Sequence, residues 1–362
     1  MKLLAIETSC DETGIALVEG TKTESGFIFE TKQAALLSQA ALHAPYGGVY
    51  PNLAKREHQK NLPVLWEQFK DEEYDAIAVT AGPGLEPALW QGIEFAKKIA
   101  AEKGLPLFPV NHMEAHLISS LAQKEHSDIL ENVRMSLQDI KLPLLALLIS
   151  GGHTEFVLMK EWFTYKVMGA TLDDAVGECF DKVARMLGLP YPGGPAISQI
   201  AESARSKSQI SNIKLPRPML NTPTCDVSFS GLKTAALYAL RDATKDRPLQ
   251  ESEKAAFAAE FEGAVGDVFV AKTRRALEKT GAQTFVIGGG VAANTYLRTR
   301  LEDLLKKEFP SIEMRLPELS ITGDNAIMIA QAALAHLLTG HWPLATRTEE
   351  IHAVGSLSIA TK

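Results

Sequence analysis

The amino-acid sequence repeats one order of secondary-structure elements, and this repetition limits the chain to an α/β fold made of two similar halves. Each half begins with two apolar runs that predict a pair of strands, at residues 2–6 and 14–18, and again at 144–150 and 155–159. Each half then has a third strand that runs into a glycine-rich loop and a helix, at residues 76–84 and 284–293. An internal duplication is therefore expected, although unduplicated α/β proteins of this length also show such echoes.

A long helical stretch separates the second strand pair from the second glycine-rich loop. Apolar residues recur at helical spacing from Val176 to Leu187, with Thr171 or Asp173 as the expected N-cap, and a further helix is expected at about 251–280. The Pro- and Gly-rich segments 191–195 and 215–223 are expected to be turns or linkers. We expect an N-terminal α/β lobe over residues 1–140 and a C-terminal α/β lobe over 141–362, with a helical insertion at about 171–280.

Composition narrows the class of protein. Of the 362 residues, 46% are apolar and 22% are charged, which is typical of a soluble globular protein. The longest apolar run, residues 142–149, contains Pro143 and falls far short of the ~18 residues that a membrane span needs. The apolar run after Lys2 is too short for the core of a signal peptide. We therefore expect a cytoplasmic protein with no membrane partner.

Cysteine spacing and charge exclude further classes. Cys10, Cys179 and Cys225 are far apart and form no C-x-x-C pair, which disfavours a disulfide framework and a thiolate zinc site. The net charge of −7 gives no overall indication of nucleic-acid binding. A polyanion would have to meet local basic clusters, and these are equally well explained as solvated faces. The clustered residues are Lys55, Arg56, Lys60, Lys182, Arg185 and Arg217.

Two histidines four residues apart form a candidate metal site. His112 and His116 follow a short strand and open a helix, so both imidazoles lie on one helix face. Asp324, at the start of an apolar helix, is a candidate third ligand, and such a set suits Fe(II) or Zn(II). A polar helix face and a helix-capping Asp are the alternative explanations. Glu114 points to the opposite side of the helix, so a metalloprotease is disfavoured.

Three glycine-containing turns could bind a nucleotide. The turn at residues 7–14 and the turn Ser150-Gly151-Gly152-His153-Thr154 could cradle phosphates through backbone N–H groups and hydroxyls, although most such turns bind nothing. Residues 288–293 fit the dinucleotide pattern G-x-G-x-x-A after a strand and before a helix. Only about 70 residues follow this pattern, so a complete dinucleotide domain does not fit there. An adenosine contact is preferred over an NAD-dependent dehydrogenase.

These features belong to a larger set of motifs that occur in the order of one known family. The set is Ala5-Ile6-Glu7-Thr8-Ser9-Cys10-Asp11-Glu12-Thr13, Tyr46-Gly47-Gly48-Val49, Ala81-Gly82-Pro83-Gly84-Leu85, the motif at 111–116, the segment 148–154, Phe180-Asp181-Lys182, Tyr191-Pro192-Gly193-Gly194-Pro195, the segment 228–234 and Gly289-Gly290-Val291-Ala292-Ala293-Asn294. The sequence closely resembles the bacterial TsaD family of tRNA N6-adenosine threonylcarbamoyltransferases, from residue 5 to about residue 330.

The resemblance implies a duplicated, two-lobe, actin-like and sugar-kinase-like ATPase (ASKHA) fold. It implies transfer of a threonylcarbamoyl group from threonylcarbamoyl-AMP to N6 of the adenosine next to the anticodon, with release of AMP, in tRNAs that read codons beginning with adenine. One divalent metal ion, Fe(II) or Zn(II), and an adenine nucleotide (threonylcarbamoyl-AMP, ATP or AMP) are the implied ligands. The implied partners are tRNA, a paralogous non-catalytic subunit (TsaB-like) and a small ATPase (TsaE-like).

Site residues follow by position in the motifs. The implied metal ligands are His112, His116 and Asp324, and the implied substrate contacts are Leu148, Ile149, Ser150, Gly151, Gly152, Asp181, Gly194 and Asn294. We expect Asp11 or Glu12 to accept a proton or to position substrate. The chain departs from the family in a polar stretch at about 123–141 and in a longer tail after Gly340.

Rival functions remain open at this point. An ATPase or small-molecule kinase of the same fold would turn over ATP without needing RNA. A non-catalytic scaffold like the family's paralogous partner would have no need to keep His112, His116 and Asp324.

Overall fold

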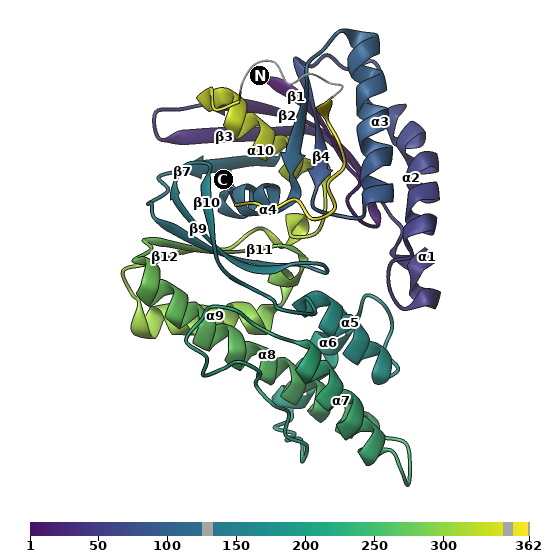
Figure 1. Cartoon of the computed structure of the whole chain (residues 1–362), viewed down its shortest axis with the longest axis vertical. Coiled ribbons are helices and arrows are strands. Elements are labelled where there is room, and N and C mark those ends of the chain that lie inside the picture. Colours follow the sequence, from purple (N-terminus) through teal and green to yellow (C-terminus); the bar gives the residue numbers. More distant parts are fainter. Residues whose placement is uncertain (125–132, 343–349, 361–362) are drawn as a thin grey trace.

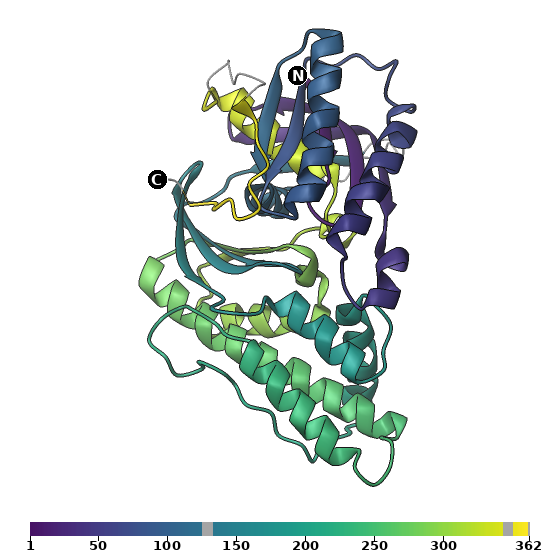
Figure 2. The same cartoon turned by 45° about the vertical axis from the view of Figure 1, so that its right-hand side comes forward.

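Two mixed β-sheets organise the chain. The structure is a computed structural model that describes residues 1–124, 133–342 and 350–360. Helices cover the outer face of each sheet and fill the space between the sheets, so the layers run helix, sheet, helix, sheet, helix (Figures 1 and 2). Of the two segments in which the sequence departs from the family that it resembles, residues 125–132, 343–349 and 361–362 lie outside the described residues.

The first sheet grows from an antiparallel meander of three strands, to which parallel strands are added beside β1. Its strands are β1 (Lys2–Glu7), β2 (Glu12–Lys22), β3 (Gly26–Ser38), β4 (Ala76–Gly82), β5 (Leu107–Asn111), β6 (Gln123–Lys124) and β7 (Val133–Gln138). Their order is β5-β4-β1-β2-β3-β7-β6. Strands β1 and β4 are apolar along almost their whole length because helices cover both of their faces.

The second sheet repeats this plan. Its strands are β8 (Leu144–Ile149), β9 (Thr154–Glu161), β10 (Thr164–Ala170), β11 (Thr284–Gly288) and β12 (Glu313–Arg315). Strands β8, β9 and β10 form the meander, and β11 runs parallel to β8 as β4 runs parallel to β1. The order β12-β11-β8-β9-β10 therefore matches β5-β4-β1-β2-β3, which confirms the duplication expected from the sequence.

The outer helices cover one face of each sheet. Those on the first sheet are α2 (Pro51–Trp66) and α3 (Glu86–Lys103), preceded by α1 (Ala40–His43) and the 3₁₀ turn η1 (Ala44–Tyr46). Those on the second sheet are α5 (Val176–Met186), α6 (Gly193–Ser206), α7 (Ser230–Ala243), α8 (Glu251–Thr280) and α9 (Thr295–Glu308). The 3₁₀ turns η2 (Gly290–Ala293) and η3 (Leu319–Ile321) precede α9 and α10.

The central layer consists of α4 (His112–Leu121) and α10 (Ala326–Thr339). One apolar core joins these helices to inward-facing residues of both sheets, such as Ala5 and Ala16 of the first and Leu148 and Val157 of the second. Ten residues of α4 are buried, because sheets lie on both sides of it. The functional side chains on these two helices are thus held between the two halves of the molecule.

The C-terminal part of the chain returns to the first sheet. Helix α10 packs against β1 and β2, and Ile351 joins the core beneath α2 and α3. By its contacts α10 belongs more with the first sheet than with the second, although the central core joins it to both. We propose that the two lobes divide between β7 and β8 and that this last segment belongs with the first lobe.

The N-cap expected for the helix after residue 175 was wrong. Helix α5 has Ala175 at its N-cap, and the hydroxyl of Thr154 accepts the N–H of Val176 at 2.9 Å. Asp173 instead caps α7, where it accepts the N–H groups of Phe229 and Ser230 at 2.8 and 3.1 Å. A strand hydroxyl thus replaces the cap that sequence spacing predicted.

The segment 191–195 is not entirely a turn. Gly193 already begins α6, and its N–H donates to Asp181 at 2.7 Å. Proline is compatible with the first turn of a helix, since that turn leaves its N–H groups without helical partners. The segment 215–223 is non-helical, as expected, and the helix expected at about 251–280 is α8. In the described part of the chain, no helix combines the length and apolarity that crossing a membrane requires.

Candidate active site

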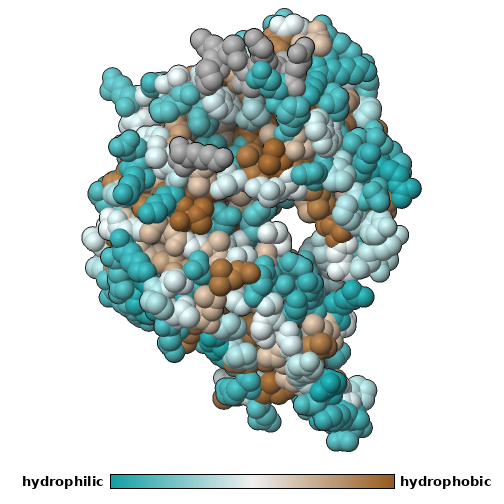
Figure 3. Space-filling model, viewed as in Figure 1, coloured by the Kyte–Doolittle hydropathy of each residue, from teal (hydrophilic) through white to brown (hydrophobic). Residues whose placement is uncertain are grey.

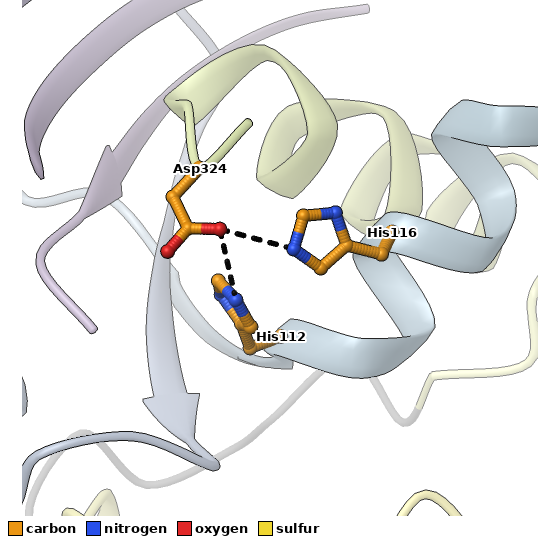
Figure 4. A group of neighbouring side chains, drawn as sticks. All are labelled: His112, His116 and Asp324. Carbon is orange, nitrogen blue, oxygen red and sulfur yellow. Dashed lines mark hydrogen bonds and ion pairs between the residues drawn. The ribbon is translucent and has the colours of Figure 1, made fainter. Parts of the chain in front are cut away.

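His112, His116 and Asp324 converge in the central layer. One carboxylate oxygen, Oδ1 of Asp324, lies 3.4 Å from Nε2 of His112 and 3.1 Å from Nε2 of His116 (Figure 4). The three potential ligand atoms all lie within 4.8 Å of one another, and both imidazoles are buried. The expectation that the two histidines share a helix face is confirmed, because both reach the same carboxylate.

The start of α4 explains how the histidines are aimed. Helix α4 begins as soon as β5 ends, and the side chain of Asn111 caps it by accepting the N–H groups of Met113 and Glu114 at 2.9 and 3.1 Å. Glu114 lies on the opposite face of the helix, where its Oε1 is 2.8 Å from Nε2 of His336 on α10. A metalloprotease-type glutamate is therefore absent from this group, as the spacing predicts.

Asp324 does not cap α10. That role belongs to the next residue, Asn325, whose side chain accepts the N–H of Met328 at 3.1 Å. Asp324 is left free to face the two histidines. The capping explanation, which sequence spacing favoured, is therefore wrong.

The carboxylates and imidazoles of this group shift one another's pKa values. Burial alone would lower the pKa of His112, but the carboxylates of Asp324 and Glu7 outweigh it and raise the pKa to about 10. Burial alone would raise the pKa of Asp324, but the two imidazoles hold it well below its usual range. Burial lowers the pKa of His116. Two imidazole nitrogens and one carboxylate oxygen, buried and clustered, form a donor set that fits Zn(II) or Fe(II).

The turn between β1 and β2 carries Asp11 and Glu12 toward this group. Burial and the neighbouring carboxylates of Asp11 and Asp324 raise the pKa of Glu12 to about 9, and Ser38 donates its hydroxyl to Glu12 at 3.1 Å. Glu12 is therefore protonated at neutral pH and donates a proton more readily than it accepts one. The expectation that Asp11 or Glu12 accepts a proton or positions substrate stays a prediction.

The turn after β8 presents unused backbone donors. Ser150 and His153 close it through Ser150 N–H to His153 O at 2.8 Å and His153 N–H to Ser150 Oγ at 3.1 Å. Gly151 and Gly152 are exposed, and their N–H groups have no acceptor in the described chain. The α5 residue Gly177 packs so closely that an added Cβ would lie 2.6 Å from the carbonyl of Ser150. The turn thus combines free donors with a neighbouring helix N-terminus, a combination that suits an anion.

His153 was missed by the sequence analysis as a separate site residue. Burial and the nearby histidines His112 and His116 lower its pKa to about 4, so it is neutral at physiological pH. Its electrostatic coupling to Asp324 brings the second-lobe turn within range of the metal-compatible group. The turn after β8 and the metal-compatible group therefore border the same site.

Helices α5 and α6 form the opposite wall of the site. Asp181 on α5 accepts the N–H of Gly193, and Gly194 has open space where a Cβ would stand. Burial and the carboxylates of Asp11 and Asp181 raise the pKa of Tyr191. Asp11 of the first lobe therefore lies close to Tyr191 and Asp181 of the second. The space-filling view shows an opening between the two lobes beside these helices (Figure 3).

Some of the residues expected to contact substrate face open space, and the side chains of others are already engaged by contacts within the protein. Gly289 has φ of +89°, and an added Cβ would lie 2.4 Å from the carbonyl of Ile149, whereas Gly290 faces open space. The side chain of Asn294 caps α9 at Leu297 and donates to Glu262 at 2.7 Å. Leu148 and Ile149 are fully buried strand residues, so only their backbone is available to a ligand.

Known proteins resemble this chain over nearly its full length. The sequence model of the TsaD family, tRNA N6-adenosine threonylcarbamoyltransferase, matches residues 31–331. A tRNA N6-adenosine threonylcarbamoyltransferase of Aromatoleum aromaticum is 39% identical over 98% of this chain and 99% of its own length. The corresponding protein of Bordetella petrii is 41% identical over 94% of this chain and 92% of its own length.

Solved structures resemble the fold at low sequence identity. Full-length HypF in its phosphate- and nucleotide-bound form has a TM-score of 0.53 at 13% identity, covering 93% of this chain and 46% of HypF. HypF of T. kodakarensis gives 0.52 at 13% identity, covering 93% of this chain and 48% of its own. This likeness concerns the fold alone, and the expected actin-like and sugar-kinase-like architecture is confirmed.

Proposed function

The chain belongs to the TsaD family of tRNA N6-adenosine threonylcarbamoyltransferases, and we propose that the site between its lobes takes the threonylcarbamoyl group from threonylcarbamoyl-AMP. The protein is a transferase that forms threonylcarbamoyladenosine in tRNA. The acceptor is N6 of the adenosine next to the anticodon, in tRNAs that read codons beginning with adenine, and AMP leaves. The observation that carries the proposal is the convergence of the buried His112, His116 and Asp324 group with the open second-lobe turn.

The reaction requires activation of both reactants. The exocyclic amine of adenine is a poor nucleophile because its lone pair is delocalised into the ring. Its nitrogen attacks the carbamoyl carbon, a C–N bond forms, the C–O bond to the phosphate of AMP breaks, and the amine loses a proton. In this proposal Asp11 accepts that proton, and Glu12, whose pKa burial raises to about 9, donates a hydrogen bond to the acyl group.

His112, His116 and Asp324 are the residues that would hold one divalent ion, Fe(II) or Zn(II). Such an ion supplies Lewis acidity for the carbonyl, or a positive charge for the threonyl carboxylate. Both imidazoles are buried and the Asp324 side chain is 20% exposed, so the position is shielded from solvent on the histidine side and open on the side of the carboxylate.

The second lobe is suited to the AMP half of the donor. The N–H groups of Gly151 and Gly152 are aimed at no protein acceptor and can stabilise the negative charge that develops on the leaving phosphate. We place the adenosine against Gly289 and Gly290. Gly290 and Gly194 offer space for close approach of a ligand, because neither would bring a Cβ within 4 Å of another atom.

Asp181 and Asn294 fit an indirect role in substrate binding. The side chain of Asp181 accepts the N–H of Gly193, and that of Asn294 donates to Ser198 and Glu262 at 2.9 and 2.7 Å. These bonds fix the helix termini that border the nucleotide position. The protein partners we propose are a paralogous non-catalytic subunit and a small ATPase.

Reconstitution tests the proposed reaction. The full-length protein is mixed with these two partners, threonylcarbamoyl-AMP and unmodified tRNA, and digested tRNA is analysed by mass spectrometry. We expect threonylcarbamoyladenosine together with one AMP for each modified adenosine. Modified tRNA formed without release of AMP would contradict the proposed donor, and a complete absence of product would contradict the proposed reaction.

A further inference from the structure

Glu7 is a fully buried carboxylate directly behind the metal-compatible group. It ends β1, and its side chain has no exposed surface. Oε2 accepts the hydroxyl of Thr80 at 2.5 Å and lies 3.2 Å from Nδ1 of His112. Oε1 accepts the backbone N–H of Ser9. Three donors from three segments of the chain thus converge on one side chain.

This arrangement is costly for folding alone. A carboxylate taken out of water loses several kcal/mol of solvation, which a pair or hydrogen bonds must offset. No Lys or Arg of the described chain forms an ion pair with Glu7, and His112 is its ionisable partner. An apolar residue would fill this place at the end of a buried strand at lower cost. The carboxylate is therefore best explained by what it does to His112.

We propose that Glu7 is a positioning residue that fixes the tautomer and the ring orientation of His112 for metal binding. The inference rests on the proposed metal site. Because Nδ1 of His112 donates to Glu7, Nε2 is the nitrogen that faces Asp324, and it is the one that can bind an ion once the ion displaces its proton. Glu7 also contributes a second negative charge, so that Asp324 and Glu7 together balance a divalent cation.

The backbone N–H of Ser9 makes the tautomer of His112 depend on whether residue 7 is a glutamate or a glutamine. A glutamine at this position has one oxygen and one NH₂ group in place of two oxygens. The oxygen must face Ser9, because the backbone N–H of Ser9 cannot rotate away or become an acceptor. The NH₂ group then faces Thr80 and Nδ1 of His112, so that Nδ1 must accept and Nε2 must carry the proton. In the Glu7→Gln variant the nitrogen aimed at the ion is therefore blocked.

The same helix provides a matched control. Glu114 lies between the two histidines in sequence and forms a similar carboxylate–histidine contact, with His336, on the opposite face of α4. A glutamine there keeps an oxygen for the N–H of His336 and does not contact either proposed ligand. Glu114→Gln thus reports any general disturbance of α4, and Glu7→Gln adds the change of tautomer.

Cobalt(II) affinity of the metal-free full-length chain, measured by competition with a chelating dye, tests the inference. We expect Glu7→Gln to weaken Co(II) binding by about 10- to 100-fold and Glu114→Gln to bind like the wild type. Wild-type affinity in Glu7→Gln, or an equal loss in both variants, would overturn the role of Glu7. Equal Co(II) binding by wild type and by a His112→Ala/His116→Ala double variant would instead reject the metal site itself.

If Glu7→Gln fails to fold, nitrogen-15 NMR of the zinc-loaded wild type tests the tautomer of His112 directly. The inference requires His112 to carry its proton on Nδ1 and to bind zinc through Nε2. A zinc-loaded protein in which Nδ1 of His112 is the bound or unprotonated nitrogen would overturn it.

Discussion

Glu114 and His336 join the two helices of the central layer through a 2.8 Å contact between Oε1 and Nε2. The imidazole stacks on Trp342, at a ring-centroid distance of 4.8 Å, and packs against the tilted ring of Phe163 at 3.9 Å. This contact fixes α4 against α10 on the side away from the candidate metal site. We expect Glu114→Ala to lower the free energy of unfolding by ~1–3 kcal/mol, because a buried imidazole loses its partner. Urea denaturation measures the change, and Glu114→Gln should recover most of it.

Loss of one proposed metal ligand should affect the chemistry more than the fold. We expect His116→Ala to lower the rate of tRNA modification by at least ~100-fold, the order lost when one strong electrostatic stabiliser is removed. Elemental analysis should show a matching loss of bound metal. His352→Ala is the control, since His352 is exposed beside Trp90. Undiminished turnover in His116→Ala would contradict a catalytic role for the metal.

Adjacent glycines allow a paired test of the nucleotide position. We expect Gly290→Val to weaken AMP binding more than tenfold while the protein stays folded, because an added Cβ meets no protein atom there. At Gly289, with φ of +89° and the carbonyl of Ile149 in the way, the same change should instead destabilise the fold. Calorimetry with AMP and thermal unfolding separate the two effects. Unchanged AMP affinity in Gly290→Val would move the nucleotide elsewhere.

The cap of α7 should make stability depend on pH in the acid range. Burial alone would raise the pKa of Asp173, but donors from Ser228, Phe229 and Ser230 outweigh it and hold the pKa at about 2. The carboxylate therefore stabilises the fold above its unfolded pKa of ~3.9, and this contribution is lost as the pH falls toward about 2. We expect Asp173→Ala to cost ~1 kcal/mol at neutral pH. Denaturation curves of variant and wild type should converge near pH 2.

Basic residues at the rim should act on tRNA binding and leave the chemistry unchanged. A Cβ on Gly47 would lie 2.9 Å from Nη1 of Arg185, so α5 of the second lobe meets the first lobe at this point. Lys55 and Arg56 follow on α2, and both are exposed. Charge reversal at Lys55 or Arg185 should weaken tRNA binding and flatten its salt dependence, because fewer counterions are released. A filter-binding titration over several salt concentrations measures the slope.

The sequence predicted the architecture well because the relevant signals are local. Apolar runs and glycine-rich loops located β1, β4, β8 and β11, and the repeated order predicted two related sheets. The i, i+4 spacing of His112 and His116 was sufficient to place both side chains on one face. The position of Asp324 before an apolar helix made it a candidate ligand but allowed a capping role as well, and the family resemblance favoured the ligand.

Other features depend on contacts between distant segments and could not be read from spacing. Thr154 caps α5 from a neighbouring strand, which displaced the predicted cap at Asp173. In the sequence Glu7 is only the polar last residue of a strand. Its contacts with Thr80 and His112 arise because β4 and α4 pack beside that strand in the fold. The return of α10 to the first sheet has no counterpart in the periodicity, because an apolar helix fits either half.

The position of α10 also governs when the metal-compatible group can exist during synthesis. His112 and His116 leave the ribosome early, but Asp324 precedes the last helix of the described chain, which packs between sheets that are already complete. A nascent chain that lacks this helix has nothing to hold Asp324 in the central layer, and so cannot assemble the three-residue group. Assembly of the three-residue group thus requires both halves to have folded around their shared central helices.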